Sequence, residues 1–458
     1  MKLNKVISAL LALSAAFVAT LAGKLMMQEI IAVGLFVYFL LNFIDSIGKS
    51  YNLMDITILL ALFQCMLMPS IVFHVYNEDA MVIALKYDMG VTAEAYFGYM
   101  FPAVIALIVG IKLPELLQPS YGLKFSKAVN ESRKYLKGKG NLGILMIIIG
   151  FVAGFLQIFI PGDLQYVAYL FGKLLYVGVL YTFFSDAKNR TWYLVGGIIA
   201  ILANSLAQAM FGELVYLLAL SVILILLGRQ ISKALKYSIA IFGFIFVIVL
   251  QSIKSDYRDV AWLGKGGDQG NTEAFFSLFI DRLSSPGQFF DVTLMFPTVN
   301  RFNQGMIVGK VMVHVPQRAP YAEGETIFTS LAASFVPRIL WPDKPISGGK
   351  FNMERFTGFV IEGYSMNVSP MGEAYGNFGV GGGVLFMLIY GLFFSGIIFI
   401  LLNIIRKKPT LILWFPVLFL NSIQIETDIL MCVNSLLKNL IFIGFCYWAA
   451  DRFLRLKL

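Results

Sequence analysis

The chain is poor in charged residues, cysteine and histidine, and each scarcity excludes something. Only 14% of its 458 residues are Asp, Glu, Lys or Arg, whereas soluble domains average about 25%. The three cysteines lie in apolar segments without metal-ligand spacing, so they predict neither a disulfide framework nor a cysteine metal site. The acids and the two histidines form no cluster with cation-ligand spacing, so we expect no metal and no cofactor.

What the chain has in abundance is apolar sequence. Hydrophobic residues make up 58% and aromatic residues 15% of the chain, and its mean hydropathy is +0.77. Apolar runs of about 20 residues are long enough to cross a bilayer as helices. We therefore expect an all-α integral membrane protein with about twelve transmembrane helices. They are predicted near residues 6–23, 28–46, 54–76, 95–114, 142–161, 164–184, 193–210, 212–228, 238–254, 379–405, 410–426 and 430–449.

The first apolar run resembles a signal peptide, because Lys2 and Lys5 precede residues 6–22. Its length and the membrane helices that follow favour the first span instead. Orientation is predicted from the connections. Residues 118–140 carry six Lys and Arg against the single acid Glu131, and the other connections on the same side are also basic. The positive-inside rule then places both termini in the cytoplasm, and the net charge of +9 needs no nucleic-acid partner.

With this orientation, one long polar interval lies outside the cytoplasm. The sequence predicts an N-terminal bundle of about nine helices (1–253), a large external loop (254–378) and about three C-terminal helices (379–458). Phe275–Leu283 and Phe289–Phe296 have the pattern of amphipathic helices. We expect short helices in this loop to lie over the outer mouth of the bundle and to carry the chemistry.

The external loop is nearly neutral, so its arginines need an explanation other than orientation. Lys254 and Arg258 lie one helical turn apart where the ninth helix leaves the membrane. Arg282 follows an apolar face, and Arg338 stands within the apolar run 335–341. Surface ion pairs are one interpretation. The other interpretation is phosphate binding near the lipid headgroups, because one guanidinium can bind two phosphate oxygens at once.

Two motifs carry a family resemblance. Phe335-Val-Pro-Arg-Ile-Leu-Trp-Pro-Asp-Lys-Pro345 is followed by Gly372-Glu-Ala-Tyr-Gly-Asn-Phe-Gly379 and a glycine-rich helix. Together with the many spans and one large external loop, these motifs resemble the Wzy-type polymerases of bacterial polysaccharide repeat units, among them the O-antigen, exopolysaccharide and enterobacterial common antigen polymerases.

The resemblance implies location, reaction and partners. It implies a multi-pass protein of the bacterial cytoplasmic membrane that transfers a growing glycan from a polyprenyl diphosphate to an incoming lipid-linked unit at the outer face. A flippase and a chain-length regulator would be its partner proteins. A diphosphate leaving group needs neutralisation more than protonation. We therefore expect a metal-independent clamp of Arg258, Arg282 and Arg338, supported by Lys344 and Lys254.

The acceptor hydroxyl also needs a base. Glu373 is the first choice, although an acid near a helix N-terminus is also explained by the helix dipole. His314 is the second choice, and Glu426 and Asp428 lie in the turn before the last span and could contribute. Trp341 and Tyr375 are candidates for stacking on sugars or for packing at the membrane interface.

Other assignments remain open. Lys173 and Lys438 are predicted within spans, where a charge marks either function or a buried partner. A ligase resembling the O-antigen ligases uses the same donor with a different acceptor lipid. A flippase or other transporter is the alternative from another class, and inverted repeats with broken helices would favour it.

Overall fold

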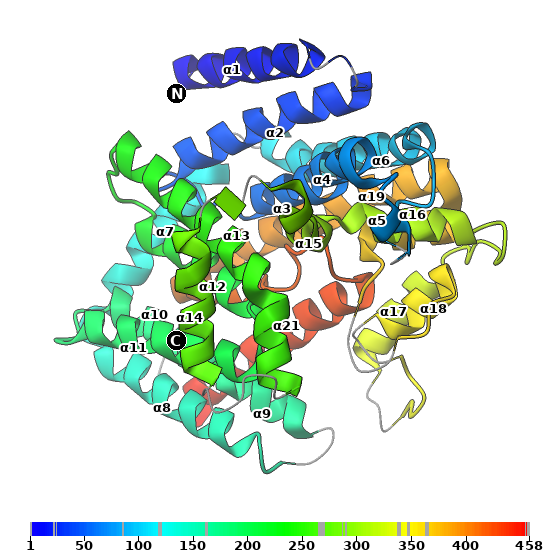
Figure 1. Ribbon diagram of the computed structural model, residues 1–458. Coiled ribbons are helices and arrows are strands. Elements are labelled where there is room, and N and C mark those ends of the chain that lie inside the picture. The colour runs from blue at the N-terminus through cyan, green and yellow to red at the C-terminus, as the bar shows by residue number, and fades with distance from the viewer. Residues whose placement is uncertain are drawn as a thin grey trace.

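The computed structural model describes the chain except for residues 1, 22, 24, 85–86, 118–120, 161–163, 264–270, 286, 289–290, 337–339, 346–348, 362–365, 454 and 456–458. All regular secondary structure in this described part is helical (Figure 1). The prediction of an all-α fold is therefore confirmed. The long apolar helices make this a multi-pass membrane protein.

Eight helices in the described residues are long and apolar enough to cross a membrane. They are α2 (Met27–Ser46), the composite helix Leu53–Tyr76, α6 (Ala93–Leu117), α9 (Leu164–Gly172) with α10 (Leu174–Phe184), α11 (Arg190–Gln208), α13 (Lys233–Leu263), α19 (Ser369–Ile405) and α21 (Ile429–Phe453). A ninth span results if α7 (Tyr121–Leu136) and α8 (Gly140–Leu156), which are bent by 97°, count as one. Three further apolar helices are shorter, so twelve full-length spans are not confirmed.

The shorter apolar helices have different surroundings. Helix α1 (Lys2–Leu21) packs against α2 and lies at the top of the molecule in Figure 1. Helix α12 (Gly212–Leu226) packs against α11 and the C-terminal region.

The composite helix Leu53–Tyr76 is not a regular α-helix. It contains α3 (Leu53–Leu62), π-helical turns at Phe63–Leu67 and Val72–Tyr76, and α4 (Met68–Ile71) between them. A short α5 (Ala80–Ala84) follows. π-helical turns often occur at functional sites.

One predicted helix is wrong. Residues 410–426 form a 3-10 helix (Pro409–Trp414), one turn of α20 (Phe415–Leu418) and then a series of turns. Trp414 and Phe415 are fully buried, so the segment packs against protein on its apolar sides. Irregular backbone inside a membrane bundle is tolerated when protein surrounds it and satisfies its polar groups. Here the side chains of Asn439 and Gln424 donate hydrogen bonds to backbone carbonyls of the segment.

Glycines bring two pairs of helices into backbone contact. Helices α6 and α19 cross where Gly110 faces Leu388 and Gly391: a Cβ on Gly110 would lie 2.3 Å from the Leu388 carbonyl oxygen, and one on Gly391 would lie 2.7 Å from the Leu107 oxygen. Helices α8 and α10 meet in the same way at Gly143 and Gly178. Small residues allow such close packing where helix association depends on van der Waals contact.

The interval 254–378 is built of short helices, as predicted. After α13 come α14 (Asn271–Ser284), α15 (Val292–Phe302), α16 (Gln304–His314), α17 (Glu325–Phe335) and α18 (Lys350–Thr357). Helix α14 contains the predicted amphipathic segment 275–283, and α15 overlaps the second one, whose residues 289–290 lie outside the described residues. Helix α16 does not cap the bundle: it packs into it against α4 and α19, and α17 lies along α21.

Helix α19 is broken at Gly379, whose φ of 67° and ψ of −160° are not helical. The break frees carbonyl groups of the preceding turn. The carbonyl oxygens of Gly376 and Asn377 accept hydrogen bonds from the amides of Ala322 and Glu323, each at 3.0 Å. The loop before α17 is therefore fixed to the first part of α19 (residues 369–378), which carries Glu373.

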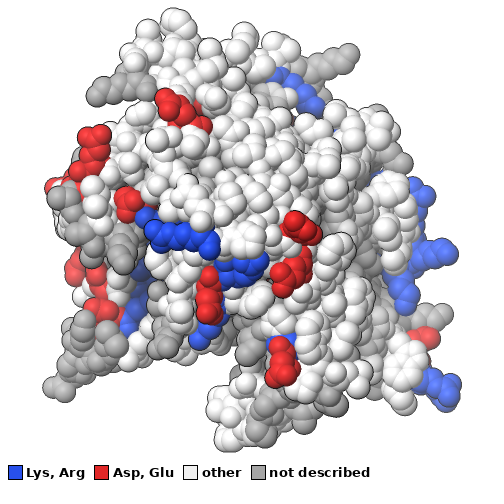
Figure 2. Space-filling model, turned by 90° about the vertical axis from the view of Figure 1, so that its right-hand side faces the viewer, with Lys and Arg blue, Asp and Glu red and all other residues white. Residues whose placement is uncertain are grey.

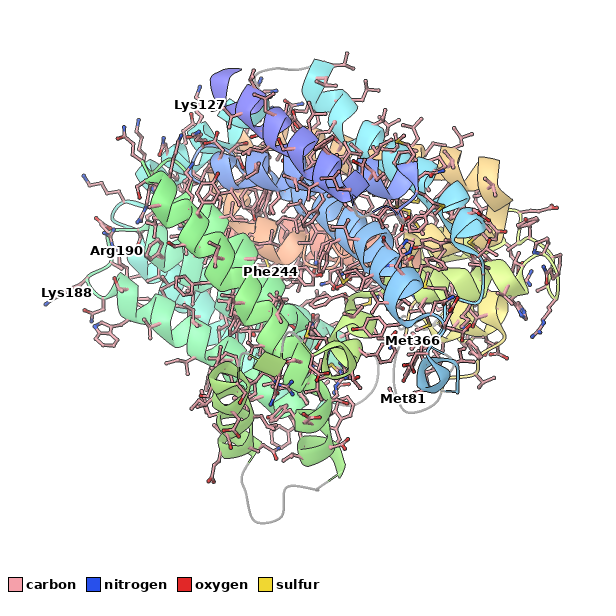
Figure 3. The ribbon with its side chains drawn as sticks, turned by 45° about the horizontal axis from the view of Figure 1, so that its top comes forward. Met81, Lys127, Lys188, Arg190, Phe244 and Met366 are labelled. Atoms are coloured by element: carbon pink, nitrogen blue, oxygen red, sulfur yellow. The ribbon has the colours of Figure 1, made fainter. Side chains whose placement is uncertain are left out.

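The charged connections and the loop helices occupy different sides of the molecule. Figure 3 shows Lys127, Lys188 and Arg190 on one side and Met81 and Met366 on the other, with Phe244 of α13 between them. The face formed by α16, α17 and α18, on the right of Figure 1, is turned toward the viewer in Figure 2. Acidic and basic side chains are intermixed over its centre and left, and mainly basic ones lie along the right-hand edge.

Candidate functional site

The turns at residues 419–428, which we call the 419–428 loop, and the neighbouring α19 place three carboxyl groups before α21, two of them buried and one half-buried. The loop is fixed by Thr57, whose hydroxyl donates to the Ile423 carbonyl oxygen at 3.2 Å. Glu426 and Asp428 belong to the loop, and Glu373 reaches its end from α19. The three carboxyls differ in how many of their oxygens already accept hydrogen bonds.

Glu373 is fully buried, and both of its oxygens have partners. Its Oε1 accepts a hydrogen bond from the Thr326 hydroxyl at 2.9 Å, and its Oε2 accepts one from the Ile429 amide at 3.1 Å. Asn377 links the same groups, because its amide donates to the Thr326 hydroxyl at 2.7 Å and to the Glu373 carbonyl oxygen at 2.8 Å. Glu373 thus connects α17, α19 and the first turn of α21.

Asp428 is the N-cap of α21. Its Oδ1 accepts a hydrogen bond from the Met431 amide at 2.7 Å, and a carboxylate at this position satisfies an amide that has no helical partner. Burial raises the pKa of Asp428, and the hydrogen bond from Met431 opposes that rise. Asp428 also lines a small pocket together with Thr326, Ser330 and Asn352. The pocket has a volume of about 10 Å³, close to the minimum for one water molecule.

Glu426 has one oxygen in use and one without a partner. Its Oε1 accepts a hydrogen bond from the Tyr216 hydroxyl at 2.6 Å, whereas its Oε2 is buried and accepts none. Burial raises the pKa of Glu426, while Tyr216, the nearby Gln64 amide and the charge of Lys254 lower it. Gln64 belongs to the first π-helical turn, and its own Oε1 is also buried without a partner.

Lys254, whose charge acts on this carboxyl, is one of three neighbouring cations. Lys254 and Arg258 of α13 lie close enough to Arg301 of α15 for their positive charges to repel one another. Arg258 stacks on the Trp262 ring, with its guanidinium carbon 4.4 Å from the ring centroid, and donates to the Ala209 carbonyl oxygen at 3.3 Å. Among the described residues, no ion pair joins any of the three cations to a carboxylate. We call Lys254, Arg258 and Arg301 the cation cluster.

The other two predicted clamp arginines stand differently. Arg282 of α14 lies near the same end of α13, with its Nη2 3.9 Å from an oxygen of Asp256, which is more than half exposed. Such a long, solvated pair contributes little stability. Arg338 lies outside the described residues.

Lys344 serves the end of α17. Its ammonium donates to the carbonyl oxygens of Ala333 and Val336, at 2.8 and 2.9 Å, and a lysine is favourable beside the last carbonyls of a helix. Trp341 lies half-buried in the adjoining turn, where its carbonyl oxygen accepts a bond from the Lys344 amide at 3.2 Å. These contacts place both residues beside α17, and their role toward a substrate stays a prediction.

Tyr375 and His314 belong to α19 and α16, whereas the cation cluster belongs to α13 and α15. The Tyr375 ring is buried and packs edge-on against Tyr99, with ring centroids 5.0 Å apart. His314 ends α16, packed against Gly358. Burial and the positive charges of Arg318 and Arg355 lower its pKa. A lowered pKa keeps the ring neutral near pH 7, the form that accepts a proton.

A family model described as a domain of unknown function, DUF8712, matches residues 99–400. The chain belongs to this family. The DUF8712 region runs from α6 into α19 and includes the cation cluster, Tyr216 and Glu373, whereas the 419–428 loop follows it. Neither a curated protein nor a solved structure matches the chain.

The DUF8712 region contains residues that the sequence did not single out. Arg301 was one cation among many, because nothing in its neighbours shows that α15 folds back toward α13. Tyr216 lies in an apolar helix with no sequence link to Glu426, which is 210 residues away. Proximity created by the fold was the missing information in both cases. Within the described residues, no group of three or more His, Cys, Asp or Glu side chains could hold a metal ion.

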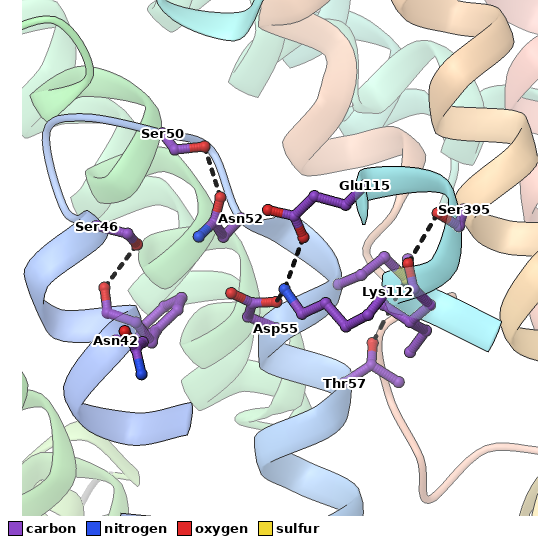
Figure 4. Close-up of polar contacts among 12 residues, drawn as sticks. Asn42, Ser46, Ser50, Asn52, Asp55, Thr57, Lys112, Glu115 and Ser395 are labelled. Atoms are coloured by element: carbon purple, nitrogen blue, oxygen red, sulfur yellow. Dashed lines mark hydrogen bonds and ion pairs between the residues drawn. The ribbon is translucent and has the colours of Figure 1, made fainter. Parts of the chain in front are cut away.

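Polar clusters elsewhere in the bundle have internal partners. Lys112 of α6 pairs with Asp55 of α3 and with Glu115, the latter at 2.8 Å (Figure 4). They line a cavity of about 20 Å³, which has room for a water molecule. Lys173, predicted as either functional or paired, is buried and pairs with Glu213. Lys438 of α21 lies over the Tyr166 ring, 4.2 Å from its centroid.

Proposed function

We propose that this chain is a membrane glycosyltransferase that polymerises polyprenyl-diphosphate-linked oligosaccharide units, in the manner of the Wzy-type polymerases it resembles. The single observation that carries the proposal is the cation cluster. Two cations of membrane helix α13 and one of α15 lie together, and no carboxylate in the described part forms an ion pair with them, although the charges of Asp256 and Glu426 act on Arg301 and Lys254. Their mutual repulsion favours binding of a polyanion.

The chemistry needs such a cluster. In the proposed reaction an acceptor hydroxyl attacks the anomeric carbon of the donor sugar, and the bond to the diphosphate breaks. Negative charge grows on the departing diphosphate, and preorganised cations at that position lower the barrier. Lys254, Arg258 and Arg301 supply this charge from two different helices. Arg282 and the predicted Arg338 would extend the clamp, and the lipid tail would lie along the apolar outside of the bundle.

A transporter of lipid-linked glycans is the second candidate. The break of α19 at Gly379 and the irregular segment after Pro409 favour it, because transporters bind substrates at discontinuous helices. A flippase moves its substrate without making a glycosidic bond. A ligase would make the bond but transfer the finished polymer to another lipid. The three functions therefore leave different products when the protein is impaired.

The test is the cell-surface glycan of a strain that produces Arg258→Ala or Arg301→Ala, displayed on a gel. We expect single repeat units on the surface anchor instead of a ladder, because the leaving group is no longer neutralised. Lys350→Ala removes an exposed cation of α18 and is the matched control, which should keep the ladder.

Each other pattern contradicts polymerisation in its own way. Loss of even the single unit would indicate a flippase or an earlier step. Long polymer retained on the carrier lipid would indicate a ligase. A normal ladder in both arginine variants would remove the clamp. The amount of variant protein in the membrane is measured in parallel, because a variant that fails to accumulate there would also lose the ladder.

A further inference from the structure

Among the three carboxyls at the 419–428 loop, Glu426 alone has a buried oxygen, Oε2, that accepts no hydrogen bond, and its side chain as a whole is half-buried. Glu373 uses both oxygens, between Thr326 and the Ile429 amide. Asp428 is occupied as the N-cap of α21. An unpartnered buried carboxylate oxygen is costly. The hydrogen bonds that Glu373 and Asp428 accept explain why those two carboxyls are buried. The free oxygen of Glu426 needs another explanation.

The position of Glu426 relates it to the cation cluster. Lys254 is the member of the cluster whose charge acts on Glu426, and it also lies close enough to Arg258 and Arg301 to be repelled by them. An anion held at Lys254 would therefore lie near Glu426. A base for transfer from a diphosphate has to reach the hydroxyl that attacks the neighbouring sugar carbon. Glu426 meets this requirement better than Glu373, because only Glu426 has an oxygen that accepts no hydrogen bond.

We infer that Glu426 is the general base that removes the proton from the acceptor hydroxyl, through its Oε2. This assignment rests on the proposed function. The acceptor oxygen forms the new bond to the anomeric carbon as its proton passes to Glu426. The carbon–oxygen bond to the diphosphate breaks, and its electron pair remains on the diphosphate. Glu426 then releases the proton to water, so that atoms and charges balance.

Tyr216 is a positioning residue in this scheme. Its hydroxyl holds Oε1 at 2.6 Å, which fixes the carboxyl plane and leaves Oε2 free. A hydrogen bond to the charged form of a carboxyl lowers its pKa. Tyr216 therefore helps to keep Glu426 ionised, and thus able to accept a proton, although burial favours the neutral form.

The experiment uses the full-length protein in proteoliposomes and the single lipid-linked units that accumulate in a strain without it. Polymer formation is followed from pH 5 to 9, and binding of undecaprenyl diphosphate is measured separately. We expect Glu426→Gln to lower kcat about 100-fold or more with unchanged undecaprenyl diphosphate binding. Glu426→Asp should recover part of the activity. In Tyr216→Phe the acidic limb of the pH profile should move to higher pH, because the base then has a higher pKa.

Glu373→Gln is the comparison variant. If Glu373 acts through structure, the variant lowers thermal stability and leaves the shape of the pH profile unchanged. Near-normal kcat in a folded Glu426→Gln protein would overturn the assignment, as would an unshifted acidic limb in Tyr216→Phe. Wild-type protein that binds undecaprenyl diphosphate but never extends the units would instead refute the proposed polymerase activity, and the assignment with it.

Discussion

A buried carboxyl in this protein takes its role from the number of hydrogen bonds that its oxygens already accept. Glu373 and Asp428 hold the start of α21, while Glu426 keeps one oxygen without a partner. Their residue types and their places near predicted helix ends do not distinguish these roles. The sequence pointed to Glu373 as the first base because it lies between the external loop and the tenth predicted span, at the expected membrane surface. The contact with the Ile429 amide, 56 residues away, depends on the fold.

Glu373→Ala is expected to destabilise the protein. The substitution leaves the Thr326 hydroxyl and the Ile429 amide without their acceptor, at about 1–3 kcal/mol for each buried group left unpaired. The free energy of unfolding in lipid nanodiscs measures the effect. Glu325→Ala removes an exposed acid from the first turn of α17 and should cost less than about 1 kcal/mol. Equal losses in both variants would show that Glu373 does not join the three helices.

The arginines were predictable as a group but not as a cluster. Arg258 was identified from its place where a helix leaves the membrane, and it does lie beside Lys254. Arg301 joins the cluster only because α15 folds back toward α13. This brings Arg301 close to Arg258, 43 positions earlier in the chain. Hydropathy and charge patterns describe one element at a time, and a binding cluster is made between elements.

At the scale of the element, apolar length was a good guide to helices and a poor guide to their environment. Most predicted spans correspond to helices, and α13 continues to Leu263, beyond its predicted end at residue 254. The predicted helix 410–426 was wrong, because a segment buried among other helices is as apolar as one that faces lipid. Pro416 and the polar residues after Leu420 argue against a continuous helix, but a prediction from apolar length does not take them into account.

The break in α19 at Gly379 can be tested by substitution. Gly379→Ala should lower the free energy of unfolding by roughly 1–3 kcal/mol, because φ is +67° there and a side chain is strained in that conformation. The added Cβ would also lie 3.1 Å from the Tyr321 ring. Denaturation in nanodiscs measures the change.

Gly381→Ala is the matched control on the same helix. A Cβ at Gly381 meets nothing within 4 Å, so this substitution should be neutral or stabilise by up to about 1 kcal/mol. Indistinguishable stabilities for the two variants would mean that the helix runs straight through residue 379.

At the scale of the whole molecule, the testable feature is the direction in which the helices cross the membrane. The charge asymmetry predicts that Lys188 faces the cytoplasm and that the helices of residues 254–378 face outward. The structure places Lys188 and Met366 on different sides of the molecule (Figure 3). Labelling from the two sides of the membrane tests this orientation.

Single cysteines at exposed positions provide the sites for this labelling. In a protein without its native cysteines, Arg318→Cys should react with a membrane-impermeant maleimide on intact cells. Lys188→Cys should react only after the membrane is opened. Labelling of both on intact cells would place the basic connections and the loop helices on the same side, and would refute both the expected orientation and an outward-facing site.

The glycine contact between α6 and α19 has a mechanical consequence. Where two backbones touch directly at Gly110 and Gly391, no layer of side chains is available to change rotamers and let one helix slide along the other. Helix α6 and the part of α19 that follows Gly379 should thus move as one rigid unit, whereas Glu373 lies in the part of α19 before that break. Any gating motion that admits a long lipid tail must then occur where helices meet through side chains, as α13 and α14 do at Tyr257 and Phe275.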